Sequence, residues 1–424
     1  MEQLTVKKQI KRSLPIAFES LINILMTLID TLVIATLGVD ALGAIGAMGV
    51  VLNFMQMSIQ TIHVSNNTLV ARAIGEEKKE SIELTTGNAV IMAVIISIIT
   101  IIFVYFIQPT FPSLFQVDKM CITYLTIRLM GFIQSSVVTV LSGHQRAIGN
   151  QGNILKLRII AVILNLLLDL IAIYKGFGIV GVAYVTILID TILAIYLYFK
   201  SKNTVKYKFK KAYFMDLFYL FKWNYIERIV SKIDNFVFNI IVSRMGKLEY
   251  AVHVILQQIA NIYEAFVQGF GDGITISVGI ATGKKDKKEI EQVKIVAKKV
   301  IKYCAIIFPI FILFIAIVVR KIALPEIELA KIYYKVLPIL ILGTYVTTSA
   351  TYYFSILRGM RDFKFLANRN MISSIIKIIL AFLLGYTLLG IIGVWLAYLI
   401  YGMSQKYLSK QRYEKMEGAK EEIC

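Results

Sequence analysis

Charged residues are scarce in this sequence: only 17% of its 424 residues are Asp, Glu, Lys or Arg, whereas 57% are hydrophobic. A water-soluble protein carries nearer a quarter charged residues, so the composition excludes an ordinary soluble enzyme and indicates that most of the chain lies in lipid. Twelve membrane-spanning helices of about 20 residues each would occupy about 240 residues. That share equals the hydrophobic fraction, so we expect little extramembrane structure.

Cysteine and histidine are also rare, with three of each. The cysteines lie far apart, so no disulfide framework or metal spacing is implied. The histidines form no His-Glu-x-x-His motif, and no Gly-x-Ser-x-Gly string occurs, which argues against an intramembrane enzyme. No Gly-x4-Gly-Lys-Ser/Thr phosphate-binding loop is present either. Direct use of ATP would therefore need a separate subunit, and we expect no organic cofactor.

The charge that is present is mostly positive, with 46 Lys and Arg against 27 Asp and Glu, a net charge of +19. In a membrane protein such an excess is expected in loops beside an anionic cytoplasmic leaflet, so we expect membrane lipids and no nucleic acid as partners. The largest basic clusters, Lys200 to Lys211 and Lys284 to Lys299, fall on the side that holds both termini. We therefore predict a multi-pass plasma-membrane protein, bacterial, with cytoplasmic termini.

Apolar stretches bounded by Gly, Pro or charged clusters predict twelve spans. They lie near residues 13–37, 42–72, 86–108, 120–144, 156–174, 178–199, 217–245, 250–281, 300–319, 332–357, 371–387 and 390–406.

The two halves of the chain match at a nearly constant offset. Leu37-Gly38 and Ala71 to Gly75 correspond to Met245-Gly246 and Gly279 to Gly283, each 208 residues later. Further along, Arg146 to Gly149 answers to Arg358 to Arg361 at an offset of 212. Because each repeat has an even number of helices, both halves keep the same orientation in the membrane. We predict an all-α integral membrane protein with twelve transmembrane helices in two pseudo-symmetric six-helix bundles around a central cleft. Its predicted parts are an N-terminal lobe (1–200), a basic cytoplasmic linker (201–216), a C-terminal lobe (217–406) and a cytoplasmic tail (407–424).

Carboxylates inside predicted spans are functional candidates because an ionised carboxylate is costly in the bilayer interior. Asp30, Asp169 and Thr186 lie seven, five and eight residues from the outer ends of their spans, which places their oxygens at similar depths of roughly 8–12 Å. Asn165 precedes Asp169 by one helical turn. These four residues predict a site for Na⁺, or for a proton held by a carboxyl group. Asp190, one turn after Thr186, is a further candidate ligand.

The second repeat lacks this set of oxygen ligands. The counterparts of Asp30, Asn165, Asp169 and Thr186 are Phe238, Lys377, Ala381 and Tyr398. Ion coupling is therefore predicted in the first lobe. The alternative is that the acids only satisfy buried hydrogen bonds between helices. Lys377 could be a counter-ion or a snorkelling residue.

Polar stripes at helical spacing predict a substrate cavity. One alternative is interhelical hydrogen bonding in a closed bundle. The mixed charges around Glu227, which include Arg228, Lys232 and Asp234, are expected to neutralise one another locally. The predicted cavity residues are Glu19 and Asn23 in the first span, Gln56, Gln60, His63 and Asn67 in the second, Glu227 in the seventh, and Gln257, Asn261, Glu264 and Gln268 in the eighth.

The order of these motifs resembles the multidrug and toxic compound extrusion (MATE) family, and it looks most similar to the DinF-like branch. The strings that carry the resemblance are Leu14-Pro15 with Asp30, Arg72 to Gly75, Arg146 to Asn150, Asn165 to Asp169, Gly176 to Ala183 with Thr186, Leu357 to Gly359, and Gly393 to Ala397. The sequence departs from the pattern at Ser142, at Asp190 and at Glu227, which lies one turn earlier than the acidic residue of other branches.

The resemblance implies two six-helix lobes and export of organic cations in exchange for Na⁺ or H⁺. Together with the acidic spans, it favours a secondary active antiporter that works by alternating access on cationic amphipathic molecules, drugs or toxins. We expect a monomer. An alternative is a flippase for lipid-linked oligosaccharides or other lipids, whose anionic substrate would favour a cavity ringed by Arg and Lys.

Overall fold

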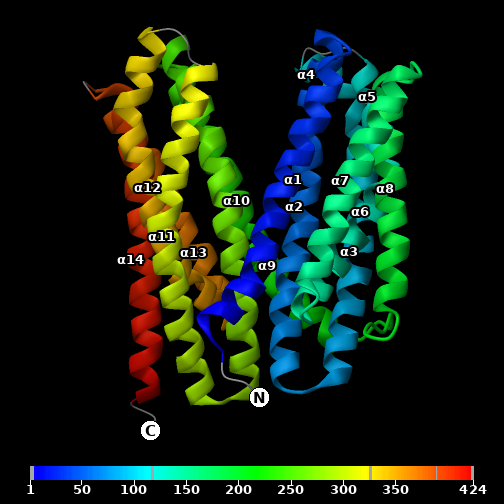
Figure 1. Cartoon of the computed structure of the whole chain (residues 1–424), viewed down its shortest axis with the longest axis vertical. Coiled ribbons are helices and arrows are strands. Elements are labelled where there is room, and N and C mark those ends of the chain that lie inside the picture. Colours follow the sequence, from blue (N-terminus) through cyan, green and yellow to red (C-terminus); the bar gives the residue numbers. More distant parts are fainter. Residues whose placement is uncertain (1–3, 116–118, 324–326, 388, 422–424) are drawn as a thin grey trace. The chain divides into compact units, whose positions relative to one another are not determined.

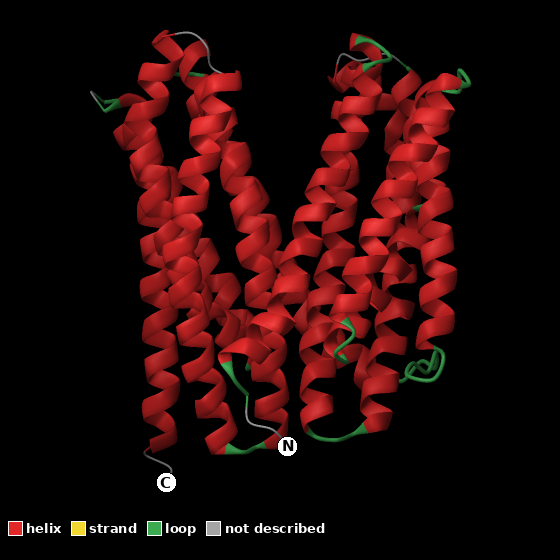
Figure 2. Ribbon diagram, in the orientation of Figure 1, coloured by secondary structure: helices red, strands yellow, loops and turns green. Residues whose placement is uncertain are grey.

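A computed structural model describes residues 4–115, 119–323, 327–387 and 389–421, and every regular element in these ranges is helical (Figure 2). Each predicted span coincides with a helix, except that 120–144 forms two helices bent by 47° at Gly131. The elements labelled in Figure 1 and their neighbours are α1 (Val6–Ala35), α2 (Val39–Gly75), α3 (Lys79–Ile107), η1 (Gln108–Thr110), α4 (Phe111–Phe115), α5 (Met120–Met130), α6 (Phe132–Ala147), α7 (Gln151–Tyr174), α8 (Gly178–Ser201), α9 (Lys211–Ser243), α10 (Lys247–Lys284), α11 (Lys287–Ala323), α12 (Ile327–Gly359), α13 (Phe363–Gly385) and α14 (Gly390–Glu421).

Length and hydropathy identify seven helices in the described ranges that could cross a membrane, and an eighth if α5 and α6 form one bent span. The four other long helices, α1, α9, α10 and α14, carry more polar and charged residues and fall outside that set. Together these give the twelve transmembrane helices predicted. Helices with ionisable residues persist in a membrane when those residues face protein or water, so the polar residues of these four helices are functional candidates.

The chain divides into two compact units. The first lobe comprises Phe18–Phe221, and the second lobe comprises Met1–Ala17 together with Lys222–Cys424. The predicted boundaries differ from these, because the chain passes from one unit to the other inside α1 and again inside α9. Sequence periodicity does not reveal such a crossing, since it continues unbroken along each helix.

A close helix contact holds the start of α1 in the second lobe. A Cβ atom built on Gly269 of α10 would lie 2.6 Å from the backbone N of Ala17, and one on Gly273 would lie 2.8 Å from the Cα of Ser13. The Gln9 and Arg12 side chains also hydrogen-bond to Ser277. Small residues spaced four apart on both helices thus allow the backbones to touch, the usual arrangement of close transmembrane helix pairs.

The segment between α8 and α9 is fixed to the first lobe. The backbone N of Lys206 donates to the carbonyl of Glu83 at 3.1 Å, and the Asn88 side chain hydrogen-bonds to the backbone of Lys208 and Lys210. A Cβ on Gly87 would lie 2.7 Å from the carbonyl carbon of Lys206, so glycine lets the segment approach α3. The predicted linker 201–216 is therefore shorter, because α9 begins at Lys211.

The predicted tail is likewise part of the second lobe. α14 continues to Glu421, and its Arg412 forms an ion pair of 2.7 Å with Asp362. The ring of Tyr413 packs edge-on against Tyr352 and lies 5.5 Å from the ammonium of Lys294. Residues 407–421 thus extend the last transmembrane helix instead of forming a separate tail.

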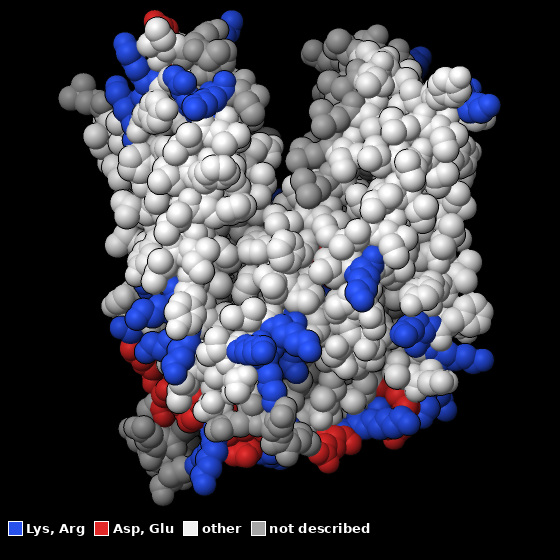
Figure 3. Space-filling view, viewed as in Figure 1, with Lys and Arg blue, Asp and Glu red and all other residues white. Residues whose placement is uncertain are grey.

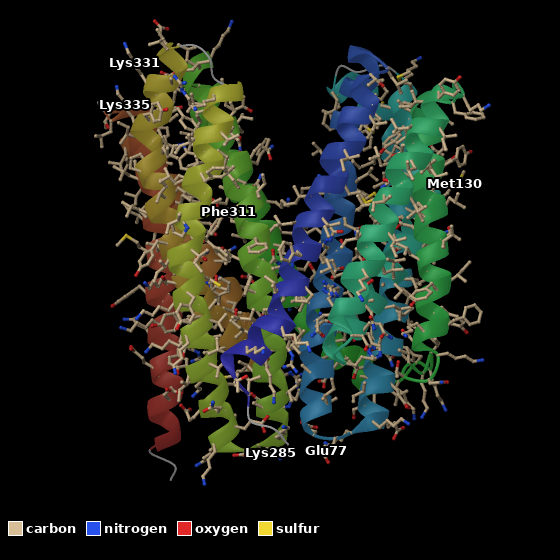
Figure 4. All side chains as sticks on the ribbon, in the orientation of Figure 1. Glu77, Met130, Lys285, Phe311, Lys331 and Lys335 are labelled. Atoms are coloured by element: carbon tan, nitrogen blue, oxygen red, sulfur yellow. The ribbon has the colours of Figure 1, made fainter. Side chains whose placement is uncertain are left out.

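The surface of each lobe is mostly uncharged along its middle and charged near its ends (Figure 3). Large apolar side chains such as Phe103 on α3 and Phe311 on α11 are 63% and 51% exposed there. In the second lobe Lys285 lies at one end, whereas Lys331 and Lys335 lie at the other (Figure 4). This distribution suits a lobe whose middle contacts hydrocarbon.

The C-termini of α6 and α12 show the internal repeat that the sequence predicts. α6 ends in a Schellman motif, in which Asn150 N bonds to Gln145 O and Gly149 N bonds to Arg146 O, with Gly149 at φ +100°. At the counterpart, 212 residues later, α12 ends with the same two hydrogen bonds, but the left-handed position is Arg361 at φ +70°. Glycine adopts that conformation without strain, whereas arginine does not.

Candidate functional site

The predicted cation ligands of the first lobe lie in its interior. Asn165 and Asp169 on α7 are 1% and 0% exposed, and Thr186 on α8 is 6% exposed. The neighbouring residue Leu167 is half exposed, so the polar atoms face protein while the apolar side of α7 faces outward. The Thr186 hydroxyl donates to the carbonyl of Val182 and keeps its lone pairs available. α7 packs against α8, which brings the two helices of the predicted site together.

The two other predicted ligands of this site are Asp30 and Asp190. The backbone of Asp30 lies in α1, but its side chain is outside the residues whose side chains the structure describes. The Asp190 carboxylate accepts a hydrogen bond from Ser135 and lies within electrostatic range of Arg128 and Arg158. The positive charge of Arg128 on α5 thus weakens the attraction of Asp190 for a free cation.

Glu19 forms the centre of a buried ion-pair network. Its carboxylate lies 3.2 Å from Arg146 and 3.5 Å from Arg158, and Glu19 itself is 2% exposed. Arg146 also lies 2.9 Å from the Nε2 atom of His63, which in turn is 3.4 Å from the Asn67 amide. Two of the predicted cavity residues, Glu19 and His63, therefore take part in interhelical contacts with Arg146, the alternative that the sequence left open, whereas Asn67 contacts His63 within α2.

The remaining cavity residues of α1 and α2 are accessible. Asn23 and Gln60 are exposed, and Gln56 is partly buried with its amide 3.4 Å from the Thr139 hydroxyl. The polar stripe of α2 thus changes character along the helix: its first half is open and its second half is built into the protein interior.

The second lobe repeats the glutamate network. Glu227 on α9 lies 3.3 Å from Arg369 and 3.5 Å from Arg358. Glu227 is the repeat counterpart of Glu19, and Arg358 is that of Arg146, so both lobes hold one buried glutamate between two arginines. The neutralisation expected among the α9 charges is not only local, because the ion-pair partners of Glu227 come from α12 and α13.

A polar stripe on α10 is accessible along its length. Asn261, Glu264 and Gln268 are exposed, and Gln257 is partly buried. The spacing of four, three and four residues keeps them on one face of the helix. Glu264 accepts a hydrogen bond of 2.7 Å from the hydroxyl of Tyr398 on α14. This face offers a carboxylate and several amides, groups suited to a polar or cationic ligand.

A buried ion pair that the sequence did not predict lies in the same lobe. The Lys377 ammonium on α13 is 2.6 Å from the Asp234 carboxylate on α9, and their side chains are 2% and 3% exposed. The rings of Phe238 and Tyr401 lie 4.6 and 4.9 Å from that ammonium. Asp234 is thus neutralised by α13, not along α9. The signal was present, since an intramembrane lysine requires an acidic partner.

The family model MatE matches residues 15–171 and 225–383, one segment in each lobe. The probable multidrug resistance protein NorM of Agrobacterium fabrum (strain C58 / ATCC 33970) is 27% identical over 182 residues, which span 39% of this chain and 39% of that protein. The matched segment therefore covers less than half of that relative.

Solved structures share the fold over nearly the whole length. A crystal structure of MATE in the straight conformation superimposes with a TM-score of 0.88 at 20% identity, covering 98% of both chains. An outward-facing multidrug resistance MATE family transporter of the MOP superfamily gives 0.88 at 20% identity over 97% of both chains. A MOP superfamily transporter from Pyrococcus furiosus Vc1 (DSM3638) gives 0.87 at 20% identity, over 98% and 97%. With the family model covering most of both lobes, this chain belongs to the MATE family of multi-pass membrane transporters.

Proposed function

We propose that this protein is a secondary active antiporter that exports cationic, amphipathic small molecules, such as drugs or toxins, in exchange for Na⁺ or H⁺. The observation that carries the proposal is the burial of Asp169 in the first lobe. An ionised carboxylate at this position is costly, and binding a cation or a proton offsets that cost. Asn165 lies one turn away on the same face, and Thr186 contributes a hydroxyl from the packed neighbour α8.

Coupling requires that ion and substrate favour different arrangements of the protein. Cation binding at Asp169 would favour one arrangement and substrate binding the other, so that each lowers the affinity for its competitor. The accessible stripe of α10 supports an organic cation as substrate, because Glu264 presents a carboxylate beside the aromatic ring of Tyr398.

The same residues weigh against a lipid-linked anionic substrate. Arg146 and Arg158 pair with Glu19, while Arg358 and Arg369 pair with Glu227. An arginine neutralised by a buried carboxylate offers little charge to a pyrophosphate group. We therefore keep the flippase only as an outcome to be tested.

The decisive experiment is efflux of a fluorescent organic cation from proteoliposomes with Na⁺ or pH gradients imposed separately. Asp169→Asn should abolish the gradient-dependent part of transport while the protein remains monodisperse. Asp216→Asn, at an exposed carboxylate in the same lobe, is the matched control and should transport normally. Full gradient-driven transport by the Asp169 variant would refute the assignment. Transport of a lipid-linked sugar instead of the cation would favour the flippase.

We further propose that both termini are cytoplasmic, that the protein acts as a monomer, and that it resides in a bacterial inner membrane. The basic segments around Lys206 and Lys285 support this orientation, since positive loops stay on the cytoplasmic side. Labelling of single cysteines introduced at Lys285 and Lys331, with a membrane-impermeant reagent on intact cells, tests it. Only the cysteine at position 331 should react.

A further inference from the structure

The second lobe holds an ammonium at its copy of the predicted cation site. Lys377 and Tyr398 are the repeat counterparts of Asn165 and Thr186, and Phe238 is that of Asp30. The Lys377 nitrogen lies 4.6 Å from the Phe238 ring and 5.9 Å from the Tyr398 ring. Residues far apart in sequence thus converge around one positive charge, at the positions where the first lobe is expected to bind a cation from solution.

The Lys377 ammonium forms an ion pair with Asp234 and is linked to the accessible stripe of α10 through Tyr398. Its ion pair with Asp234 is 2.6 Å long and almost fully buried. Tyr398 donates a hydrogen bond of 2.7 Å to Glu264, so one aromatic side chain contacts both the internal cation and the exposed carboxylate. Lys377 and Glu264 also lie within electrostatic range of each other. A positive charge so placed lowers the affinity of Glu264 for any second cation.

We propose that Lys377 is a tethered competitor of the organic cation that binds at Glu264, and that Asp234 sets the strength of this competition by holding the ammonium back. This inference rests on the proposed function, because it assumes an organic cation as substrate. The second lobe would then hold a fixed cation, the Lys377 ammonium, whereas the exchangeable Na⁺ or H⁺ would bind at Asp169 in the first lobe.

The competition predicts opposite effects from the two halves of one ion pair. Lys377→Met removes the competing charge and should tighten binding of tetraphenylphosphonium roughly tenfold, as expected when a like charge near the binding carboxylate is removed. Asp234→Asn frees the ammonium toward Glu264 and should weaken binding by a similar factor. Glu264→Gln should weaken it as well. Lys232→Met, at an exposed lysine of the same lobe, is the control and should change nothing.

A purely structural ion pair would behave differently, because replacing both of its charges at once, in Asp234→Asn/Lys377→Met, would leave the affinity at the wild-type level. That result, or equal signs for the two single variants, would overturn the inference and leave the proposed function intact. Absence of tetraphenylphosphonium binding by the wild type would instead contradict the organic-cation substrate itself. If a single variant does not fold, the Asp234→Asn/Lys377→Met double variant, which buries no charge, must bind more tightly than the wild type; equal or weaker binding refutes the competition.

A separate observation concerns the outer surface of the second lobe. A cavity of about 230 Å³ lies between α11, α12 and α14, and three lysines line it: Lys298, Lys302 and Lys406. Tyr345 and Ser349 add hydroxyl groups, and no Asp or Glu is among its described lining residues. Such a set of donors and positive charges fits an anionic phosphate ester.

The cavity lies where the surface changes from charged to apolar. Just beyond Lys302, α11 exposes Ile306, Ile310 and Phe314 by 52%, 64% and 65%. A ligand seated in the cavity would meet lysines at one end and an apolar helix face at the other. We propose that this cavity binds the headgroup of an anionic phospholipid whose acyl chains follow α11, as basic pockets between transmembrane helices do.

Thermal unfolding in nanodiscs tests the lipid site. Phosphatidylglycerol should raise the unfolding temperature of the wild type by several degrees relative to phosphatidylcholine, and the Lys298→Gln/Lys302→Gln/Lys406→Gln variant should lose that shift. Lys331→Gln/Lys335→Gln, at the opposite end of the lobe (Figure 4), should retain it. An unchanged shift in the triple variant would refute the site. Equal stabilisation by soluble glycerol phosphate would show a phosphate site without a lipid role, and would also refute it.

Discussion

The contact between α1 and α10 predicts that two Gly→Ala substitutions, at Gly269 and Gly152, change the stability of the protein in opposite directions. Gly269→Ala would place a methyl group 2.6 Å from the backbone N of Ala17 and 2.9 Å from the carbonyl carbon of Ile16. Backbone atoms cannot rotate away, so α1 must shift to restore an ordinary contact. Overpacking of this kind costs about 1–3 kcal/mol.

Gly152→Ala is the matched control, because a Cβ at that exposed position of α7 meets nothing within 4 Å. There the change only improves helix propensity, by up to about 1 kcal/mol. At roughly 2–4 °C per kcal/mol for a lobe of this size, the two variants should differ by several degrees in thermal unfolding measured in one detergent. The Gly269 variant should be the less stable.

The identity of the atoms in contact sharpens the test. Ala17→Gly should not rescue Gly269→Ala, because the atoms met at residue 17 are its backbone N and Cα, which glycine keeps. An unfolding temperature for Gly269→Ala at or above that of Gly152→Ala would refute the close approach of these helices.

Three further predictions concern stability. Glu19→Gln leaves Arg146 without a buried counter-charge and should destabilise the first lobe by about 3–5 kcal/mol in thermal unfolding; a loss below 1 kcal/mol would contradict the network. Arg361→Gly relieves a left-handed residue at φ +70° and should raise stability by up to about 1 kcal/mol, which unfolding curves of the two proteins would measure. A hydrogen bond from Lys78 holds the pKa of Glu76 below its ordinary value of 4.5. The stabilisation from this pair is present above pH 4.5 and is lost as pH falls through the lowered pKa, so Glu76→Gln should flatten the stability profile only in that acidic range.

The transmembrane helices were predictable because each apolar run is long and bounded by Gly, Pro or charge. Local signals also predicted the repeat, whose counterparts Gly149 and Arg361 end their helices with the same hydrogen bonds. The bend at Gly131 was not predicted, since one apolar run continues through it. Nor was the passage of α1 and α9 between lobes, because it depends on which surfaces pack together.

The candidate site was predictable in part. Burial of Asn165 and Asp169 follows from the cost of polar groups in lipid. The partners of the acids did not follow, because ion pairs such as Asp234 with Lys377 join residues more than a hundred positions apart. Helical spacing predicted that both His63 and Glu264 line the substrate cavity, although His63 is buried against Arg146 and Glu264 is exposed. Periodicity gives the face of a helix but not what covers it.

Because α1 and α9 each contribute residues to both lobes, the chain cannot be cut in the connecting loop into two complete lobes. A break in the backbone near Lys206 would yield two pieces, and neither would be a whole lobe, since each would retain a stretch that belongs to its partner's fold. The first piece would keep Ser13 without Gly273 to pack on. Separately made halves should therefore fold only when they are mixed, because each needs a segment of the other to complete its packing.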